Sequence, residues 1–301
     1  MFCSRNLTRF FSNIRNYEVV FPENVSFQRS FNELPKNISI PNYAQSGMPS
    51  PFEGNSPEIK TTEVIEKMKT ACKLASKILK SAGELAKPGI KTEKIDNFVF
   101  EMATQNGAYP SPLNYRGFPK SVCTSVNNCA CHGIPDSREL LEGDIINIDV
   151  TVFLDGVHGD CSKTFAVGEI DDKAAKLIKT TEECLQIGIE TCKPGALYHN
   201  IGFQIEAHAV KNGFNIIPMF AGHGIGSYFH GPPDIFHCGN SYPGHMEAGV
   251  TFTIEPLLSE GTGQVAILED DWTAVTLDHS RTAQVEHTIL ITDTGYEILT
   301  E

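Results

Sequence analysis

Two aspartates, Asp149 and Asp160, lie on the two arms of a predicted β-hairpin. The hairpin is predicted because β-branched runs flank Asp155-Gly156, the dipeptide that most readily takes the positive φ angles of a two-residue type I′ turn. With that turn Asp160 lies opposite Thr151, which shares a sheet face with Asp149 because strand side chains alternate with period two. Two carboxylates on one half-buried face need a cation or a shared proton. The alternative is an exposed face with two hydrated aspartates.

Three more polar residues interrupt apolar segments in the second half of the chain. They are His223 in Phe-Ala-Gly-His-Gly-Ile-Gly, Glu255 in Phe-Thr-Ile-Glu-Pro, and Glu286 in Ala-Gln-Val-Glu-His-Thr-Ile-Leu-Ile. A glutamate inside a strand is unfavourable unless the sheet face that bears it is wet or binds metal. Each residue alone suits a structural role, but with the Asp pair they form a set of four carboxylates and one imidazole. That set has enough oxygen donors for two divalent ions about 3.5–4 Å apart.

Other chemistries fit the sequence less well. The run Gly222-His-Gly-Ile-Gly is not a dinucleotide loop because no helix follows it, and no Gly-x-Ser-x-Gly elbow indicates a serine hydrolase. Cys129-Ala-Cys-His resembles half a zinc site but lacks a second Cys/His pair, which favours buried thiols. His132 and His230 lie beside glycine and proline in predicted loops. They could supply neutral hydrogen-bonding groups to a substrate, although His132 could equally be a structural loop histidine.

The elements that must position these residues follow a repeated order. Amphipathic helical patterns cover residues 61–86 and 92–107 and are followed by the strands of the hairpin region. Helical patterns return over residues 171–192 and 197–212, and a second strand-rich region then runs to the C-terminus. This order predicts an α+β fold with two similar halves, each with helices on one face of a mainly antiparallel sheet.

The composition favours a globular protein and argues against a nucleic-acid binder and a membrane-spanning protein. The 301 residues are 41% hydrophobic and 20% charged, which is typical of a globular chain, and the formal charge of −13 argues against a nucleic-acid partner. Nine cysteines without regular spacing indicate a reducing compartment. No apolar run approaches the roughly 18 residues that a membrane span needs.

The N-terminus has the features of a targeting segment. Arg5, Arg9 and Arg15 precede the first acidic residue, Glu18, and apolar residues recur at helical spacing among them. This pattern predicts an amphipathic organelle transit peptide, with an ordinary N-terminus as the alternative. Residues 18–57 show no periodicity and are predicted to form a linker or arm over the domain. The expected organisation is therefore transit peptide and arm over 1–57 and a catalytic domain over 58–301.

Five separated motifs resemble the metal-ligand motifs of type 1 methionine aminopeptidases. They are Asn147-Ile-Asp-Val-Thr, His158-Gly-Asp, Gly222-His-Gly-Ile-Gly, Thr253-Ile-Glu-Pro and Gln284-Val-Glu-His-Thr. Two more segments, Pro119-Lys-Ser-Val-Cys-Thr-Ser-Val-Asn-Asn and Cys131-His-Gly-Ile-Pro-Asp, resemble the family's loop before the first metal-binding strand. The likeness runs from about residue 60 to the C-terminus, and with the N-terminal segment the chain is most similar to the mitochondrial form.

The resemblance implies a pseudo-symmetric pita-bread fold and a metal-activated water that cleaves off an N-terminal methionine. It implies that the ligands of two divalent ions (cobalt, manganese, iron or zinc) are Asp149, Asp160, His223, Glu255 and Glu286. It also implies Glu255 as proton acceptor and His132 and His230 as substrate-contacting histidines. The implied methionine pocket comprises Tyr115, Phe118, Cys123, Phe229 and Trp272. The expected partners are polypeptide N-termini, and the expected state is a monomer in the mitochondrial matrix.

Two positions depart from the family pattern, and three rival assignments are less suitable. Cys161 replaces a usual threonine, and Pro112 stands where bacterial relatives often carry a pocket cysteine. Both affect the fine tuning of the site and leave the ligand set unchanged.

A type 2 enzyme would carry a helical insertion between Glu255 and Glu286, and the segment here is too short. A proline-specific relative would carry a large extra N-terminal domain. A catalytically inactive binding protein would have lost metal ligands, and all five are present.

Overall fold

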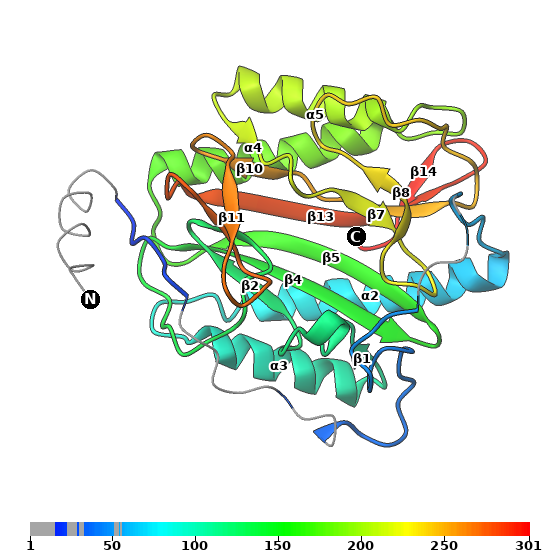
Figure 1. Ribbon diagram of the computed structural model, residues 1–301, viewed down its shortest axis with the longest axis horizontal. Coiled ribbons are helices and arrows are strands. Elements are labelled where there is room, and N and C mark those ends of the chain that lie inside the picture. Colours follow the sequence, from blue (N-terminus) through cyan, green and yellow to red (C-terminus); the bar gives the residue numbers. More distant parts are fainter. Residues whose placement is uncertain (1–15, 23–28, 30–32, 51–53, 55) are drawn as a thin grey trace.

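A large antiparallel sheet forms the centre of the computed structural model, which describes residues 16–22, 29, 33–50, 54 and 56–301 (Figure 1). Its main path runs through β1 (Tyr109–Pro110), β4 (Ile145–Leu154), β5 (Val157–Ala166), β13 (Thr282–Ile291), β9 (Thr251–Ile254), β7 (Gly222–Gly224) and β8 (Gly231–Ile235). Four further strands belong to this sheet: β2 (Cys123–Val126), β10 (Leu257–Ser259) and β14 (Tyr296–Ile298) pair with strands of the path, and β6 (Asn215–Ile216) pairs with β10. A second, three-stranded sheet consists of β11 (Val265–Ile267), β12 (Ala274–Thr276) and β3 (Cys129–Cys131).

Two pairs of helices pack along the large sheet, one pair for each half of the chain (Figure 1). They are α2 (Thr62–Gly83) and α3 (Thr92–Gln105) in the first half, and α4 (Asp172–Glu190) and α5 (His199–Lys211) in the second. The side chain of Thr61 caps the N-terminus of α2, and that of Asp171 caps the N-terminus of α4. In these two helices a side-chain oxygen accepts a hydrogen bond from a backbone N–H of the first turn. The predicted order of two helices and then strands, twice over, is confirmed.

The β4–β5 hairpin has the predicted turn and register. Asp155 and Gly156 have φ angles of 50° and 89°, as a type I′ turn requires. Thr151 pairs with Asp160 across the hairpin. Asp149 and Asp160 therefore project from the same sheet face.

Side-chain alternation divides each strand between core and site. In β4, Ile146, Ile148, Val150 and Val152 are buried in a core with α2 and α3, and the residues between them face the other way. In β13, Val285 and Ile289 belong to a second core with α4 and α5. Each aliphatic side chain so buried contributes about 1.5–3 kcal/mol to folding. The helices thus hold one face of the sheet, and that packing fixes the direction of the polar side chains on the opposite face.

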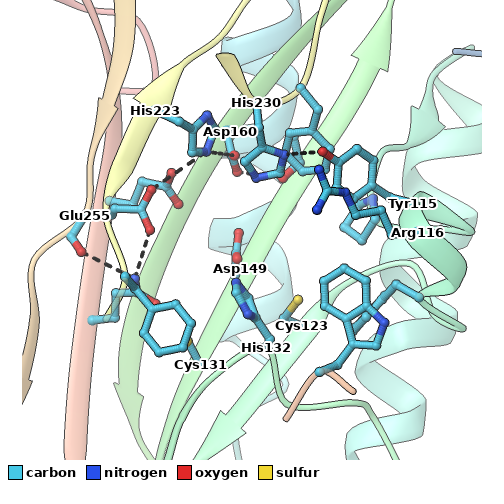
Figure 2. A pocket seen from close by; sticks show the side chains of 18 of the residues that line it. Tyr115, Arg116, Cys123, Cys131, His132, Asp149, Asp160, His223, His230 and Glu255 are labelled. Atoms are coloured by element: carbon cyan, nitrogen blue, oxygen red, sulfur yellow. Dashed lines mark hydrogen bonds and ion pairs between the residues drawn. The ribbon is translucent and has the colours of Figure 1, made fainter. Parts of the chain in front are cut away.

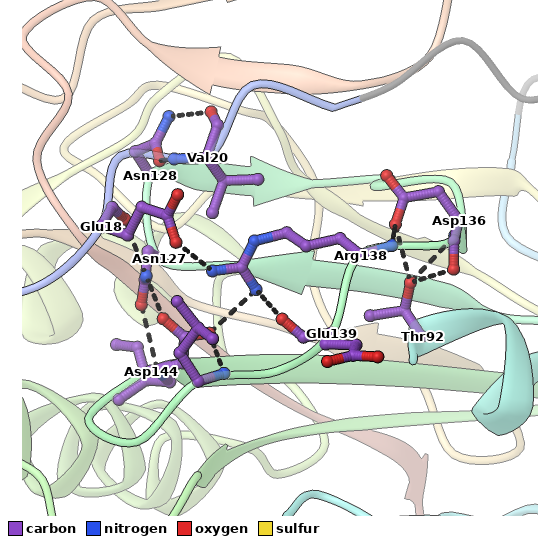
Figure 3. Close-up of polar contacts among 11 residues, drawn as sticks. Glu18, Val20, Thr92, Asn127, Asn128, Asp136, Arg138, Glu139 and Asp144 are labelled. Atoms are coloured by element: carbon purple, nitrogen blue, oxygen red, sulfur yellow. Dashed lines mark hydrogen bonds and ion pairs between the residues drawn. The ribbon is translucent and has the colours of Figure 1, made fainter. Parts of the chain in front are cut away.

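The first described residues of the arm lie against a loop of the domain (Figure 3). The N–H of Val20 donates to the Asn128 side chain at 2.6 Å, and that side chain donates back to the Val20 carbonyl at 3.0 Å. Asn127 donates to the Glu18 carbonyl, and Arg138 lies 3.4 Å from the Glu18 carboxylate.

Tyr17 reaches a part of the chain that is far away in sequence. Its hydroxyl donates to the carbonyl of His279 at 2.9 Å, and the guanidinium of Arg281 lies 4.4 Å from its ring centroid. The predicted transit segment covers residues 1–17, and its residues 1–15 lie outside the described residues. The transit peptide and the boundary at residue 57 therefore stay predictions.

A second part of the arm, residues 33–50, packs beside β1. Tyr43 is buried, its hydroxyl donates to the Ser111 carbonyl at 2.7 Å, and its ring lies edge-on to Tyr115 with centroids 5.0 Å apart. The Asn114 side chain donates to the Ala44 carbonyl at 3.0 Å. Among the helices in the described part of the chain, none combines the length and apolar character of a membrane span.

Candidate active site

The five predicted metal ligands converge on one cavity from five places in or directly beside the large sheet. Figure 2 labels Asp149, Asp160, His223 and Glu255 among them. Asp149 comes from β4, Asp160 from β5, His223 from β7 and Glu286 from β13, and Glu255 follows directly after β9. Ligand atoms of Asp160, His223 and Glu286 all lie within 4.8 Å of one another. The Nε2 atom of His223 lies 3.8 Å from an oxygen of Asp160 and 3.8 Å from an oxygen of Glu255. Residues from both halves of the chain therefore meet in a single cluster.

Two glycines allow the backbone of His223 to enter this cluster. A Cβ atom on Gly222 would collide with the carbonyl oxygen of Thr253, and one on Gly224 would collide with the carbonyl oxygen of Pro232. Glycine alone permits such close approach of neighbouring strands. The Nδ1 atom of His223 lies 3.2 Å from the Gly224 carbonyl. A proton on Nδ1 satisfies that carbonyl and leaves Nε2 free to bind a metal.

Four ionised carboxylates without a counter-ion are electrostatically unfavourable in this cluster. Burial raises the pKa of Asp149 to about 7 and that of Glu255 to about 8. Burial and the neighbouring carboxylates raise the pKa of Asp160 and of Glu286 well above the usual range. Within the described part of the chain, no lysine or arginine forms an ion pair with any of the four. Negative charge at this site therefore needs compensation from a bound cation or from protons.

The donor atoms fit divalent cations. The Oδ1 atom of Asp149 is buried and has no hydrogen-bond partner, which is costly unless a cation binds there. Carboxylate oxygens with one imidazole suit manganese, iron or cobalt and also accommodate zinc. Cys129 and Cys131 are buried free thiols and lie outside this metal-ligand cluster, in agreement with the structural role preferred for them.

Neighbouring polar groups hold the ligand side chains in place. Thr151 donates to Asp160 at 2.6 Å. Thr253 and Gln284 donate to the two oxygens of Glu255 at 2.9 and 3.2 Å. Such contacts reduce the rotamer freedom of the ligands before any ion binds.

One buried histidine fixes the backbone beside Glu255. The Nε2 atom of His237 accepts the N–H of Glu255 at 3.0 Å. Burial lowers the pKa of His237 to about 3, so the ring is neutral and can accept that hydrogen bond at neutral pH.

The two predicted substrate histidines lie on opposite walls of the cavity (Figure 2). His230 has its Nδ1 atom 2.9 Å from the Tyr115 hydroxyl, and desolvation together with nearby histidines holds its pKa well below the usual range. His132 has a left-handed backbone with φ of 55° and lies edge-on to Phe220 and Trp272. Desolvation lowers the pKa of His132 to about 4. Both rings are therefore neutral near pH 7.

Aromatic side chains form the apolar part of the cavity, whose volume is about 350 Å³. All the predicted pocket residues line it: Tyr115, Phe118, Cys123, Phe229 and Trp272. Phe118 and Trp272 meet edge to face with centroids 5.2 Å apart. The loop between β11 and β12 presents Trp272, where Asp270 accepts the backbone N–H groups of Trp272 and Thr273.

The structure brings every predicted site residue into this cavity and adds others that the sequence prediction missed. The added lining residues include Arg116, Cys131, Thr151, Phe220 and Gln284. Thr253 and His237 contact Glu255 without lining the cavity. Thr151 and Gln284 could have been found, because each lies two residues from a predicted ligand on the same strand face. Arg116 and Phe220 lie in loops where no periodicity indicates direction. The contact of His237 with Glu255 depends on tertiary folding alone.

Known proteins resemble this chain over most of its length. Residues 66–293 match metallopeptidase family M24. Chloroplastic methionine aminopeptidase 1B of Arabidopsis thaliana is 53% identical over 268 residues, covering 89% of this chain and 72% of that protein. Mitochondrial methionine aminopeptidase 1D of Homo sapiens is 48% identical over 286 residues, covering 95% of this chain and 84% of that protein.

Solved structures resemble the fold as well. The crystal structure of methionine aminopeptidase from Rickettsia prowazekii matches with a TM-score of 0.80 and 40% identity, over 81% of this chain and 100% of that one. Prolidase from Pyrococcus furiosus, at 22% identity and a TM-score of 0.66 over 81% of this chain and 65% of that one, shares the pita-bread fold alone. With its five site residues gathered in one cavity of that fold, the chain belongs to metallopeptidase family M24 and, within it, to the methionine aminopeptidase 1 family.

Proposed function

We propose that this protein is a metal-dependent methionyl aminopeptidase that hydrolyses the peptide bond after the first methionine of newly made polypeptides. Two divalent cations would be held by Asp149, Asp160, His223, Glu255 and Glu286. The observation that carries the proposal is the cluster of four carboxylates without a lysine or arginine partner among the described residues, in which Oδ1 of Asp149 is buried and unpaired. The cavity beside that cluster has an aromatic wall suited to an unbranched thioether side chain.

Glu255 is proposed as the proton acceptor. When bound, the cations supply a Lewis-acid centre that lowers the pKa of a coordinated water towards neutrality. Thr253 and Gln284 orient the carboxylate of Glu255, so its oxygens have a fixed direction towards the cavity. A carboxylate fixed in this way can accept the proton of the attacking water without first changing its side-chain rotamer.

The two histidines are proposed to act on the peptide group. If the Tyr115 hydroxyl donates to Nδ1 of His230, the ring proton lies on Nε2 and can donate to the oxygen that gains negative charge in the transition state. His132 approaches from the other wall and is proposed to hydrogen-bond the scissile amide nitrogen. Phe220 and Trp272 hold its ring edge-on, which limits its rotation.

The cellular setting is part of the proposal. The relatives 1D of Homo sapiens and Mus musculus are named mitochondrial, and others are named chloroplastic. Together with the arginine-bearing N-terminus, these names support a mitochondrial protein, and we place it in the matrix as a monomer. The net charge of −13 gives no reason to expect a nucleic-acid partner.

Peptide hydrolysis tests the proposed activity. Metal-stripped protein, reconstituted with manganese, iron, cobalt or zinc in turn, should cleave Met-Ala-Ser peptides and release free methionine. The same peptide with an acetylated N-terminus should resist cleavage, because the blocked amine can no longer bind near the metals. Equal cleavage of both peptides would exclude an aminopeptidase.

A further inference from the structure

A second cavity lies directly behind one wall of the proposed active site. Its volume is about 390 Å³, within the roughly 300–1,000 Å³ typical of ligand sites. Residues 40–43 and 49–50 of the arm form one side of this arm cavity, and residues 227–230 form part of the other. Four residues line both cavities: Tyr115, Arg116, Phe229 and His230.

The arm wall of this cavity is firmly held. Tyr43 is buried and bonded to the Ser111 carbonyl, and its ring stacks on His158 at an interplanar angle of 12°. The N–H of Gly47 bonds back to the Tyr43 carbonyl at 2.8 Å, and the Asn42 side chain accepts the N–H of Ser50. The arm cavity is therefore built from folded structure on both sides.

Arg116 is the only charged residue among the described residues that line the arm cavity. It is solvent-exposed, and no carboxylate within the described ranges lies within 4.0 Å of it. In Figure 2 it lies beside Tyr115, on the side of the cavity away from Glu255, and its guanidinium carbon is 5.7 Å from the Tyr115 ring centroid. A guanidinium that lies at the rim of two cavities and has no carboxylate partner among the described residues can bind a carboxylate of a ligand.

The backbone at this position favours a residue other than arginine. Arg116 has φ of 48° and ψ of 34°, the left-handed region that glycine adopts far more easily. The loop around it is closed by backbone hydrogen bonds from Asn114 to Phe118 and from Gly117 to Asn114. The surrounding loop therefore holds Arg116 in a conformation that costs free energy, and this motivates a search for a role of its side chain.

We infer that the arm cavity binds the part of the polypeptide substrate that follows the scissile bond, and that Arg116 favours an acidic side chain there. This inference rests on the proposed function. In the proposed pose the methionine side chain occupies the pocket that includes Tyr115, and His230 contacts the scissile carbonyl. The following residues then leave the active site past Arg116, which lines both cavities. Neutral polar groups of the arm cavity, such as Asn42 and Ser227, then suit the peptide backbone.

The test compares peptides that differ only in charge. Substrates Met-Ala-Xaa-Ser and Met-Ala-Ser-Xaa, with Xaa as Asp or Asn and as Glu or Gln, give the ratio of kcat/KM for acid over amide. The wild-type protein should favour the acid by about 2- to 10-fold at one of the two positions, and 0.5 M NaCl should reduce the ratio. Arg116→Gln and Arg116→Gly should bring the ratio to about 1, and Arg116→Glu should bring it below 1.

The control variant is Lys193→Gln, which makes the same change in net charge at an exposed loop position outside both cavities. It should keep the wild-type ratio. A wild-type ratio of 1 at both positions, or an Arg116→Glu variant with the wild-type ratio, would overturn the inference. A loss of bound metal in Arg116→Gln with an unchanged ratio would instead assign Arg116 to charge balance at the metal centre. If the wild-type protein fails to cleave even the neutral peptides, the proposed function itself is wrong.

Discussion

Asp149 has a buried carboxylate oxygen that accepts no hydrogen bond, whereas Thr151 supports Asp160 and Thr253 supports Glu255. Of these three carboxylates only Asp149 keeps a buried oxygen without a partner, and we propose that an ion supplies the missing contact. A metal ligand depends on the ion for its last contact, but a residue that acts on the substrate does not. Substitutions of a metal ligand should therefore lower both metal content and activity, whereas substitutions of a residue that acts on the substrate should lower activity alone.

Asp149→Asn should lose metal and activity together. A neutral amide is a poorer ligand than a carboxylate, and the remaining three carboxylates are left unbalanced. Metal analysis of the purified variant should show fewer than two bound ions, and peptide hydrolysis should fall below detection. Full metal content with full activity would remove Asp149 from the ligand set. Glu286→Gln should behave in the same way.

His132→Ala should keep two ions and lose turnover. The expected loss in kcat is about 10²- to 10⁴-fold, the range for a positioned acid, base or hydrogen-bonding group. KM for a short peptide should change much less than kcat if His132 acts mainly in the transition state. Metal content and steady-state kinetics on one preparation decide the matter. A His132→Ala variant that loses its metals, or that keeps full turnover, contradicts this division of roles.

At the scale of elements, we expect the arm segment over residues 33–50 to affect catalysis through Tyr43, because its ring lies edge-on to Tyr115 and Tyr115 contacts His230. Tyr43→Phe removes the hydrogen bond to the Ser111 carbonyl and should lower stability by about 0.5–1.5 kcal/mol. Tyr43→Ala also empties a buried site and should cost about 3–5 kcal/mol. Thermal unfolding measures both, and kcat/KM of the Ala variant should fall because Tyr115 loses its neighbour.

Met48→Ala is the matched control for these variants. Met48 lies in the same segment and is 70% exposed, so its stability should change by no more than about 0.5 kcal/mol. If Tyr43→Ala unfolds at the same temperature as Met48→Ala, the arm is not part of the folded unit.

Turn, cap and periodicity patterns in the sequence predicted the elements that carry the ligands. They did not predict contacts between segments that are distant in sequence and meet only in the folded protein. The Asp155-Gly156 turn and the period-two rule placed Asp149 and Asp160 on one face, and turn and cap residues located the helices to within a few positions. The packing of Tyr43 has no periodic signal, because the arm has neither helix nor strand pattern. Arg116 also lies in a segment without periodicity, and its left-handed backbone, which the surrounding loop imposes, opposes its own preference.

At the scale of the whole molecule, the proposed metal centre connects the two halves. Asp149 and Asp160 come from the half packed on α2 and α3, and His223, Glu255 and Glu286 come from the half packed on α4 and α5. Ions bound there stabilise the arrangement of both halves at once. Ligand binding at 100 times its Kd adds about 2.7 kcal/mol to the free energy of unfolding.

Chelation should therefore lower the Tm of the protein by about 5–10 °C, given about 2–4 °C per kcal/mol for domains of comparable size. Differential scanning calorimetry with and without a chelator measures the shift. Asp149→Asn should show a much smaller shift, because it binds less metal from the start. An unchanged Tm in wild-type protein that has demonstrably lost its ions would show that the centre does not stabilise the fold.

The N-terminal segment should separate into a targeting part and a structural part. Residues 1–60 fused to a fluorescent reporter should direct it to mitochondria, and replacing Arg5, Arg9 and Arg15 with Gln should leave it in the cytosol. Deletion of residues 1–15 should leave hydrolysis unchanged. Deletion of residues 1–22 also removes the contacts of Tyr17 and Val20 and should cost about 1–3 kcal/mol of stability. Cytosolic fluorescence of the unmodified fusion would contradict the mitochondrial assignment.

The contact of Tyr17 with His279 and Arg281 has a consequence for the order of events during translation. The ribosome makes Tyr17 among the first residues, and Arg281 among the last. The binding place of Tyr17 therefore does not exist until synthesis of the chain is nearly finished. Until then the start of the arm cannot make this contact, and the proposed targeting segment is not held by it. The contact becomes possible once Arg281, the residue directly before β13, has been synthesised.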